Sequence, residues 1–316
     1  MSFTLLSSPL QGFTDFRFRN AVDKFFGGID AYYAPYIRLP GQPEIKNSYR
    51  RDLLPENNRV GHLIPQVMTN CAEEFLFVAG YVQELGYKEL NWNLGCPYSM
   101  VAKRGLGSGL LKHKEKIDDL LTRVSGESDI TISLKMRLGY ENSHEILDLL
   151  PLLEKHKIKS IVIHPRLGKQ LYKGEVDLEQ FQRCIDQTSH QICYNGDIDS
   201  VIKFRELRHR FPTIKCWALG RGVIANPFLA KMIQMDNDHL PDDWTDQFSR
   251  FHDTLFQYYE EALSGPGHIL LKMQSFWEYF SRLFSNPHKA YKNIKKAKNI
   301  KAYYEAVGVN IAGERI

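Results

Sequence analysis

The amino-acid sequence predicts a (β/α)8 barrel followed by a small all-helical domain, and three observations lead to this fold class. Eight short apolar segments rich in β-branched residues recur along the chain, each followed by a stretch of helical length. Polar residues and glycines gather directly after these segments. After Met235 the strand pattern stops and helical periodicity replaces it. Alternating strands and helices form parallel sheets, which close most economically into a barrel. An open, doubly wound sheet is the structural alternative.

The predicted strands have the composition of buried parallel strands. They are Phe3–Ser8, Asp30–Ala34, His62–Met68, Glu89–Asn93, Thr131–Met136, Ser160–His164, Gln191–Asn195 and Lys215–Leu219. Amphipathic stretches predict helices between them, at Cys71–Leu85, His144–Lys155, Asp177–Gln187 and Ser200–Arg210. Because barrel enzymes build their sites at the C-terminal ends of the strands, the polar residues found there favour the barrel over the open sheet.

The helical domain begins after a polar, proline-broken linker, Asp236–Asp243. We therefore predict a barrel over residues 1–238 and a helical domain over residues 239–316. A first helix has core positions at Phe248, Phe251, Leu255, Tyr258 and Ala262, and Ser264–Gly267 ends it. A second helix has core positions at Leu270, Met273, Trp277, Phe280 and Phe284. A third, lysine-rich helix is predicted over Tyr291–Tyr304.

Composition excludes several classes of protein. No apolar run approaches the roughly 20 residues that a membrane span needs, and the first residues lack the basic flank of a signal peptide. The five cysteines are scattered and never spaced as Cys-x-x-Cys, which argues against a disulfide framework, a zinc site or an iron–sulfur cluster. We expect a cytoplasmic protein with reduced thiols, without a metal, a membrane or an obligate protein partner.

Positive charge is concentrated near the end of the chain. The net charge is only +4, but the stretch Ser281–Tyr304 contains no acidic residue. Its basic residues are Arg282, Lys289, Lys292, Lys295, Lys296, Lys298 and Lys301. This stretch predicts a surface for a polyanion such as RNA. The alternative is an ordinary solvated helix face.

Two glycine turns follow the last two predicted strands. Asn195–Asp197 (Asn-Gly-Asp) follows the seventh strand, and Gly220–Gly222 (Gly-Arg-Gly) follows the eighth. Glycines let backbone N–H groups approach a phosphate closely, and Arg221 can add a charge-assisted contact. The pair predicts a phosphate site, with ordinary strand-to-helix turns as the alternative.

A cysteine stands directly after the fourth strand, in Asn93–Pro97 (Asn-Leu-Gly-Cys-Pro). The following proline fixes Cys96, which would face the barrel mouth; the alternative is a buried structural thiol, the assignment we prefer for Cys193 and Cys216. The next residues, Val101–Gly109, are typical of a mobile basic loop. Their Gly-x-Gly-x-Gly pattern is not a dinucleotide fingerprint, because no strand–turn–helix unit contains it.

Cationic side chains follow the fifth and sixth strands. Lys135 and Arg137 share one side of their strand by alternation, and His164 and Arg166 follow the next strand. A flavin needs positive charge near its pyrimidine ring to stabilise the reduced anion, although a phosphorylated substrate would need charge as well. These residues therefore predict an anionic ligand.

Together these motifs resemble the tRNA-dihydrouridine synthase family over nearly the whole chain. Five of the family's segments occur in the family's order. They are Ser8–Asp15, Asn93–Gly107 with its Asn-x-Gly-Cys-Pro signature, Lys135–Gly139, Asn195–Ile198 and Gly220–Pro227. The chain departs from the family pattern at Ser8 and Leu10, and in His164–Tyr172, where proline replaces glycine and leucine replaces threonine. The last change alters a loop near the RNA path.

The resemblance implies an FMN-dependent enzyme that uses NADPH to reduce specific uridines in tRNA to 5,6-dihydrouridine, with Cys96 as general acid. It places FMN contacts at Pro9, Leu10, Gln11, Gln66, Lys135, His164, Asn195, Gly196, Asp197, Gly220 and Arg221. Uracil and RNA contacts would be Arg38, Asn93, Arg137, Lys272 and Gln274. Two other functions stay open. One is an FMN barrel oxidoreductase acting on a small molecule, as in dihydroorotate dehydrogenases, and the other is an RNA-binding barrel without turnover.

Overall fold

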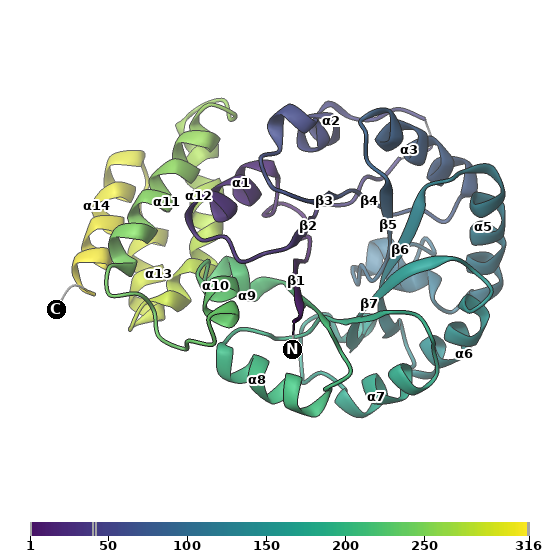
Figure 1. Ribbon diagram of the computed structural model, residues 1–316. Coiled ribbons are helices and arrows are strands. Elements are labelled where there is room, and N and C mark those ends of the chain that lie inside the picture. Colours follow the sequence, from purple (N-terminus) through teal and green to yellow (C-terminus); the bar gives the residue numbers. More distant parts are fainter. Residues whose placement is uncertain (1, 40, 42, 315–316) are drawn as a thin grey trace.

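The strands form one parallel sheet that closes on itself, in a computed structural model that describes residues 2–39, 41 and 43–314 (Figure 1). Around the sheet they run in the order β3 (Leu63–Ile64), β2 (Ala31–Tyr33), β1 (Thr4–Ser7), β9 (Cys216–Leu219), β8 (Ile192–Tyr194), β7 (Ile158–Leu167), β6 (Thr131–Gly139), β5 (Glu89–Leu94), β4 (Gln66–Val67). β3 and β4 are two pieces of one extended segment, parted only by Pro65, which has no N–H to donate. Because β3 pairs with β2 and β4 with β5, this segment closes the barrel.

The predicted (β/α)8 barrel is therefore confirmed, and all eight predicted strands are present. Helices surround the sheet: α1 (Phe16–Phe25), α2 (Asn47–Leu53), α3 (Ala72–Glu84), α5 (Lys114–Glu127), α6 (His144–Leu153), α7 (Leu178–Asp186) and α8 (Val201–Arg210) (Figure 1). The first residues of two predicted helices are N-caps in the structure. Asp177 accepts a hydrogen bond from the Gln180 N–H at 2.8 Å, and Ser200 accepts one from the Lys203 N–H at 3.1 Å. Short helices α4 (Ser99–Ala102), α9 (Arg221–Ala225) and α10 (Leu229–Gln234) lie in the connections.

The barrel interior is divided between an apolar and a polar side. Its apolar cluster contains Leu6, Ala31, Tyr33, Ile64, Val162, Cys193, Cys216 and Ala218. This confirms the assignment of Cys193 and Cys216 as buried thiols. Strands β4, β5 and β6 instead contribute the buried polar residues Gln66, Glu89, Asn91, Asn93 and Ser133. Branched apolar residues normally fill barrel interiors, so this polar side departs from the usual composition of a barrel interior.

Helices α11 (Trp244–Glu260), α12 (Pro266–Phe280), α13 (Pro287–Lys296) and α14 (Ile300–Ala312) pack together beside α1, on one flank of the barrel (Figure 1). Phe18 of α1 stacks on Phe276 of α12 with ring centroids 5.6 Å apart. The Tyr259 hydroxyl donates to Asp15, the N-cap of α1, at 2.8 Å. Residue 1, which begins the predicted barrel domain, and residues 315 and 316, which end the predicted helical domain, lie outside the described residues. No described helix is long and apolar enough to cross a membrane.

The prediction of one lysine-rich helix over Tyr291–Tyr304 was wrong, since α13 ends and α14 begins within it. Two side chains separate the helices. Asn299 caps α14 by accepting from the Ala302 N–H at 2.9 Å. The Gln274 amide donates to the carbonyls of Ile294 and Ala297, each at 2.9 Å, at the end of α13.

Candidate active site

A cavity of about 920 Å³ opens where the barrel strands end. Its volume lies within the roughly 300–1,000 Å³ of small-molecule and cofactor sites. The structure brings most of the predicted site residues to its wall: Pro9, Leu10, Gln11, Asn93, Cys96, Lys135, Arg137, His164, Asn195, Gly196, Asp197, Gly220 and Arg221. These residues come from six different strands or from the loops that follow them, and they meet because all strands of a parallel barrel end at the same face.

Four predicted site residues do not line this cavity. Gln66 is completely buried beneath it and accepts a hydrogen bond from the Asn93 amide at 2.7 Å. Arg38 is half-buried, and its charge acts on the Cys96 thiol. Lys272 donates to the Gly12 carbonyl, with its ammonium 4.7 Å from the centre of the Tyr259 ring. Gln274 makes the two helix-ending hydrogen bonds described above. Lys272 and Gln274 therefore have structural partners within the protein.

Lys135 and Arg137 form a cationic wall on β6, as alternation along the strand predicted. The Lys135 ammonium donates to Asn195 Oδ1 at 2.8 Å. Burial, with Arg137 nearby, lowers the pKa of Lys135 to about 8, so that the ammonium is still mostly charged at neutral pH. Arg137 donates to the carbonyls of Gly95 at 3.1 Å and Leu167 at 2.8 Å, which hold its guanidinium in place.

The other two members of the predicted cationic set do not add charge to this wall. Burial, together with Arg137 and Lys135, holds the pKa of His164 well below its usual value, so that the imidazole is neutral. Arg166 forms a buried ion pair with Asp197 and donates to the Gly174 carbonyl at 2.6 Å. The sequence did not show either effect, because both depend on groups from neighbouring strands.

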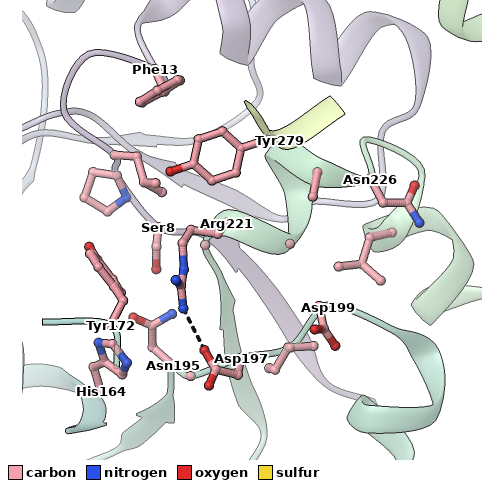
Figure 2. A pocket seen from close by; sticks show the side chains of 18 of the residues that line it. Ser8, Phe13, His164, Tyr172, Asn195, Asp197, Asp199, Arg221, Asn226 and Tyr279 are labelled. Atoms are coloured by element: carbon pink, nitrogen blue, oxygen red, sulfur yellow. Dashed lines mark hydrogen bonds and ion pairs between the residues drawn. The ribbon is translucent and has the colours of Figure 1, made fainter. Parts of the chain in front are cut away.

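The two glycine turns are joined by side chains. Arg221 donates to Asp197 Oδ1 at 2.8 Å (Figure 2). Although burial disfavours its charge, the guanidinium groups of Arg166 and Arg221 hold the pKa of Asp197 below its usual value. Asp197 has a φ of +44°, a conformation in which Asn, Asp and Gly are favoured. A Cβ at Gly196 would lie 2.9 Å from Val176 Cγ1, so a larger residue here would have to displace the Val176 side chain.

Four tyrosines line the cavity and were not predicted from the sequence: Tyr36, Tyr98, Tyr172 and Tyr279. The Tyr172 ring lies beneath two guanidinium groups, with its centre 4.3 Å from Arg221 and 5.3 Å from Arg137. Tyr279 comes from the end of α12 and packs edge-on against Phe13, with centroids 5.2 Å apart (Figure 2). Tyr172 belongs to the segment His164–Tyr172, so its presence in a family motif was an available signal. Tyr279 lacked one, because only the packing of the helices brings α12 to the barrel mouth.

The Cys96 thiol is 6% exposed and lies 4.0 Å from the Tyr36 hydroxyl at the cavity wall. Burial raises the pKa of Cys96, so that the thiol is protonated at neutral pH. The Asn93 Oδ1 atom accepts hydrogen bonds from the Gly95 and Cys96 N–H groups, each at 3.0 Å. The Cys96 thiol is therefore protonated, and its backbone is held in place at the cavity wall.

The segment Val101–Gly109 is only in part the loop that its composition predicted. Val101 and Ala102 belong to α4, residues 103–105 form a turn, and Gly107–Leu110 form a 3₁₀ turn in which Gly107–Gly109 are buried. Ser108 donates twice to the Cys96 carbonyl, from its N–H at 3.0 Å and its hydroxyl at 2.9 Å. A Cβ at Gly107 would lie 2.7 Å from Cys96 Cβ. The glycines thus allow this segment to pack against Cys96 and hold its backbone.

One buried polar atom at the cavity has no hydrogen-bond partner in the part of the chain that the structure describes. Ser8 Oγ is buried without a hydrogen-bond partner among the described residues. Ser8 lies in the cavity wall beside Asn195 and Arg221 (Figure 2). Because a buried, unpaired hydroxyl costs about 1–3 kcal/mol, a ligand with a hydrogen-bonding group at this place would gain that energy on binding.

Comparisons with solved structures identify the fold class of this chain. A variant of NCR from Zymomonas mobilis has a TM-score of 0.52 at 10% identity, over 75% of this chain and 88% of the other. The old yellow enzyme from Trypanosoma cruzi has a TM-score of 0.51 at 10% identity, over 76% and 91%. At such identity the likeness shows a shared barrel fold. The chain is thus a barrel of the kind found in these enzymes, with a large cavity at the C-terminal ends of its strands.

The family model of dihydrouridine synthases (Dus) matches residues 5–308, and this chain belongs to that family of flavin-dependent oxidoreductases. The predicted family resemblance is therefore confirmed. The tRNA-dihydrouridine synthase B of Shewanella oneidensis is 27% identical over 73% of this chain and 70% of its own length. That of Vibrio cholerae is 26% identical over 83% and 82%. No group of three or more His, Cys, Asp or Glu residues suited to a metal ion occurs in the described part of the chain.

Proposed function

We propose that this protein uses FMN and NADPH to reduce the C5–C6 double bond of specific uridines in tRNA, in the cytoplasm. The observation that carries the proposal is the shared cavity of a charged Lys135 and a protonated Cys96 thiol. A cation for the reduced flavin and a proton for the substrate are the two groups that this reaction asks of the protein. The names of the curated relatives support tRNA as the substrate.

The cavity residues fit FMN. The turns Asn195–Asp197 and Gly220–Gly222 would hold the phosphate, with Arg221 beside it, and Pro9, Leu10 and Gln11 would line the ring system. Gln66, buried beneath the cavity, would influence the cofactor site only through its hydrogen bond with Asn93. Lys135 would offer positive charge and neutral His164 a ring N–H or lone pair, while Ser8 has a hydroxyl to satisfy. When bound and reduced, FMN supplies the hydride that reaches C6 of the uracil.

Chemistry on the substrate then depends on Asn93, Cys96 and Arg137, which also line the cavity. A uridine must leave its stack to enter, which costs a few kcal/mol. We propose that Asn93 and Arg137 orient the uracil, and that the Cys96 thiol gives its proton to C5 as C6 receives the hydride. Hydride and proton together saturate the double bond. Cys96 Sγ is left as a thiolate, which the nearby charges of Arg137 and Arg38 favour.

RNA contacts are proposed on both sides of the cavity. Arg38 lies near Cys96, and Arg282 lines the cavity from the helical domain and begins the basic stretch. For Lys272 and Gln274 the internal hydrogen bonds favour an indirect role. Lys272 would fix the loop after β1 through Gly12, and Gln274 would fix the end of α13, which carries the lysines.

The function can be tested on purified protein and on RNA. We expect one non-covalent FMN for each chain, NADPH oxidation by the bound flavin, and dihydrouridine in tRNA treated with the enzyme. Mass spectrometry of RNA from a strain that lacks the protein should show uridine at the positions that the purified enzyme converts to dihydrouridine in vitro. Lys135→Ala should weaken FMN retention or slow flavin reduction. Bound FAD, or no flavin after reconstitution with excess FMN, would contradict the proposal.

Ser8→Ala tests the cofactor site itself. Losing a hydrogen bond of about 1 kcal/mol to FMN should raise the Kd of the apoprotein for FMN by about five-fold. The free energy of unfolding of the apoprotein should stay the same or rise, because the variant removes an unpaired buried hydroxyl. Fluorescence titration with FMN and urea unfolding measure the two effects. An unchanged Kd would show that Ser8 does not contact the cofactor.

A further inference from the structure

A continuous column of hydrogen bonds crosses the polar side of the barrel interior. Ser133 Oγ donates to Glu89 Oε1 at 2.6 Å, and the Asn91 amide donates to Ser133 Oγ at 2.9 Å. The Gln66 amide donates to Asn91 Oδ1 at 2.7 Å, and the Asn93 amide donates to Gln66 Oε1 at 2.7 Å. We call Glu89, Ser133, Asn91, Gln66 and Asn93 the polar column. All five residues are buried.

The polar column joins the two ends of the barrel. At the N-terminal end of the strands, Glu89 forms an ion pair with Lys159, whose side chain is half exposed. At the other end, Asn93 Oδ1 accepts from the Gly95 and Cys96 N–H groups. Glu89 and Asn93 are four residues apart on β5, or about 13 Å at the rise of a strand. Of the column, only Asn93 lines the cavity.

The two ends of the column determine the direction of every bond between them. An ionised carboxylate can only accept, so Ser133 must donate to Glu89 and use a lone pair for Asn91. Backbone N–H groups can only donate, so Asn93 must turn its oxygen toward Gly95 and Cys96 and its NH2 toward Gln66. Turning any one amide around would place two donors or two acceptors face to face, and a buried polar group that is left unpaired destabilises the fold.

We propose that Glu89 is a positioning residue for the reaction: it fixes the orientation of the Asn93 amide through Ser133, Asn91 and Gln66, and with it the Gly95–Cys96 turn. The proposal rests on the proposed function, in which Asn93 orients the uracil and Cys96 donates the proton. Its basis is that the carboxylate is the acceptor-only end of the column, while the N–H of the proton donor is at the other end. The alternative is that these side chains only fill the barrel interior.

Glu89→Gln is the variant that separates the two roles. It keeps the volume but replaces one carboxylate oxygen with an NH2 group, which must face either Ser133 or the Lys159 ammonium. If the NH2 group faces Ser133, the Ser133 hydroxyl can no longer donate to residue 89, and the hydrogen bonds of the column lose their single direction. Lys159→Gln is the matched control, because it removes the outer charge and leaves the acceptor for Ser133 in place. The Tm of each variant shows whether a loss of activity is explained by lower stability alone.

We expect Glu89→Gln to lower kcat for dihydrouridine formation by about 10–100-fold, the size of effect that a misplaced reacting group has. The KM for tRNA and the Kd for FMN should change little. A second measurement needs no RNA: iodoacetamide should alkylate Cys96 several-fold faster in Glu89→Gln than in the wild type, followed by mass spectrometry of the Cys96 peptide. The faster reaction is expected because the turn loses its Asn93 anchor. Lys159→Gln should react at the wild-type rate.

Ser133→Ala cuts the column above Glu89 and keeps the proposal testable if Glu89→Gln does not fold. It should have the same effects, and the double variant should be no worse than the more severe single one, since two breaks in one chain are not additive. Additive losses, or wild-type kcat and alkylation in both single variants, would overturn the proposal. If the wild type makes no dihydrouridine, the proposed function fails, and the alkylation rates still show whether Glu89 holds the Cys96 turn.

Discussion

Replacing Cys96 by alanine is expected to lower the rate of dihydrouridine formation by about 10²–10⁴-fold, the usual contribution of a positioned general acid. NADPH oxidation by the bound flavin should stay nearly unchanged, because no proton from the thiol is needed in that half of the reaction. Buried Cys96 is protonated and fixed by Asn93 and Ser108, so that removing its thiol removes the proton but not the cavity. Separate assays of flavin reduction and of dihydrouridine in tRNA measure the two rates.

The role of Cys96 as proton donor also predicts how the rate of tRNA reduction changes with pH. Since burial raises the pKa of Cys96 and the protonated form is the donor, the loss of rate that is due to the thiol should come only above about pH 8.5, where a free thiol is half ionised. Loss of the Lys135 charge, whose pKa is about 8, should appear in Cys96→Ala as well as in the wild type. The fall due to the thiol should be missing in Cys96→Ala. Cys71→Ala, which changes a half-buried thiol on the outside of the barrel, is the control. Wild-type activity in Cys96→Ala would mean that another group protonates C5.

Replacing Lys292, Lys295, Lys296 and Lys298 by glutamine is expected to raise the Kd for tRNA steeply at low salt. All four side chains are exposed, on α13 or just after it, and α13 packs against the turn that carries Arg282 into the cavity wall. Each lysine that neutralises a phosphate releases counterions on binding. If all four meet duplex RNA, the slope of log K against log salt should become shallower by up to about 3.6, at roughly 0.9 for each contact.

This second prediction needs a control with equal loss of charge. Lys88, Lys112, Lys116 and Lys157 are exposed lysines of the barrel, and replacing them by glutamine changes the net charge by the same amount. That variant should bind tRNA with nearly the wild-type slope. Binding measured between about 50 and 200 mM salt, where phosphate contacts show themselves, distinguishes the variants. Equal slopes in both quadruple variants would mean that α13 does not contact RNA, and FMN content should be unchanged in either case.

The sequence was most informative about properties that depend on neighbours along the chain. Strand alternation placed Lys135 and Arg137 on one side, and the position of Cys96 after a strand placed it at the barrel mouth, as the cavity confirms. Turns and caps are local as well. Asn299 is a strong N-cap residue, so the break between α13 and α14 could have been predicted from it. We missed it because the lysine spacing continues across the break.

What a residue does once it is buried was decided only by the tertiary structure. Glu89, Asn91 and Asn93 alternate along β5, which indicates one shared side, but their partners Gln66 and Ser133 come from β4 and β6.

Charge states follow the same rule. His164 is neutral and Arg166 is paired because strands distant in sequence enclose them. The sequence by itself therefore determined the barrel, the family and most of the cavity wall, since these follow from strand order and alternation. The direction of side-chain hydrogen bonds, the pKa of buried groups and the exposure of side chains depend on distances between strands. Those distances exist only after the barrel has closed.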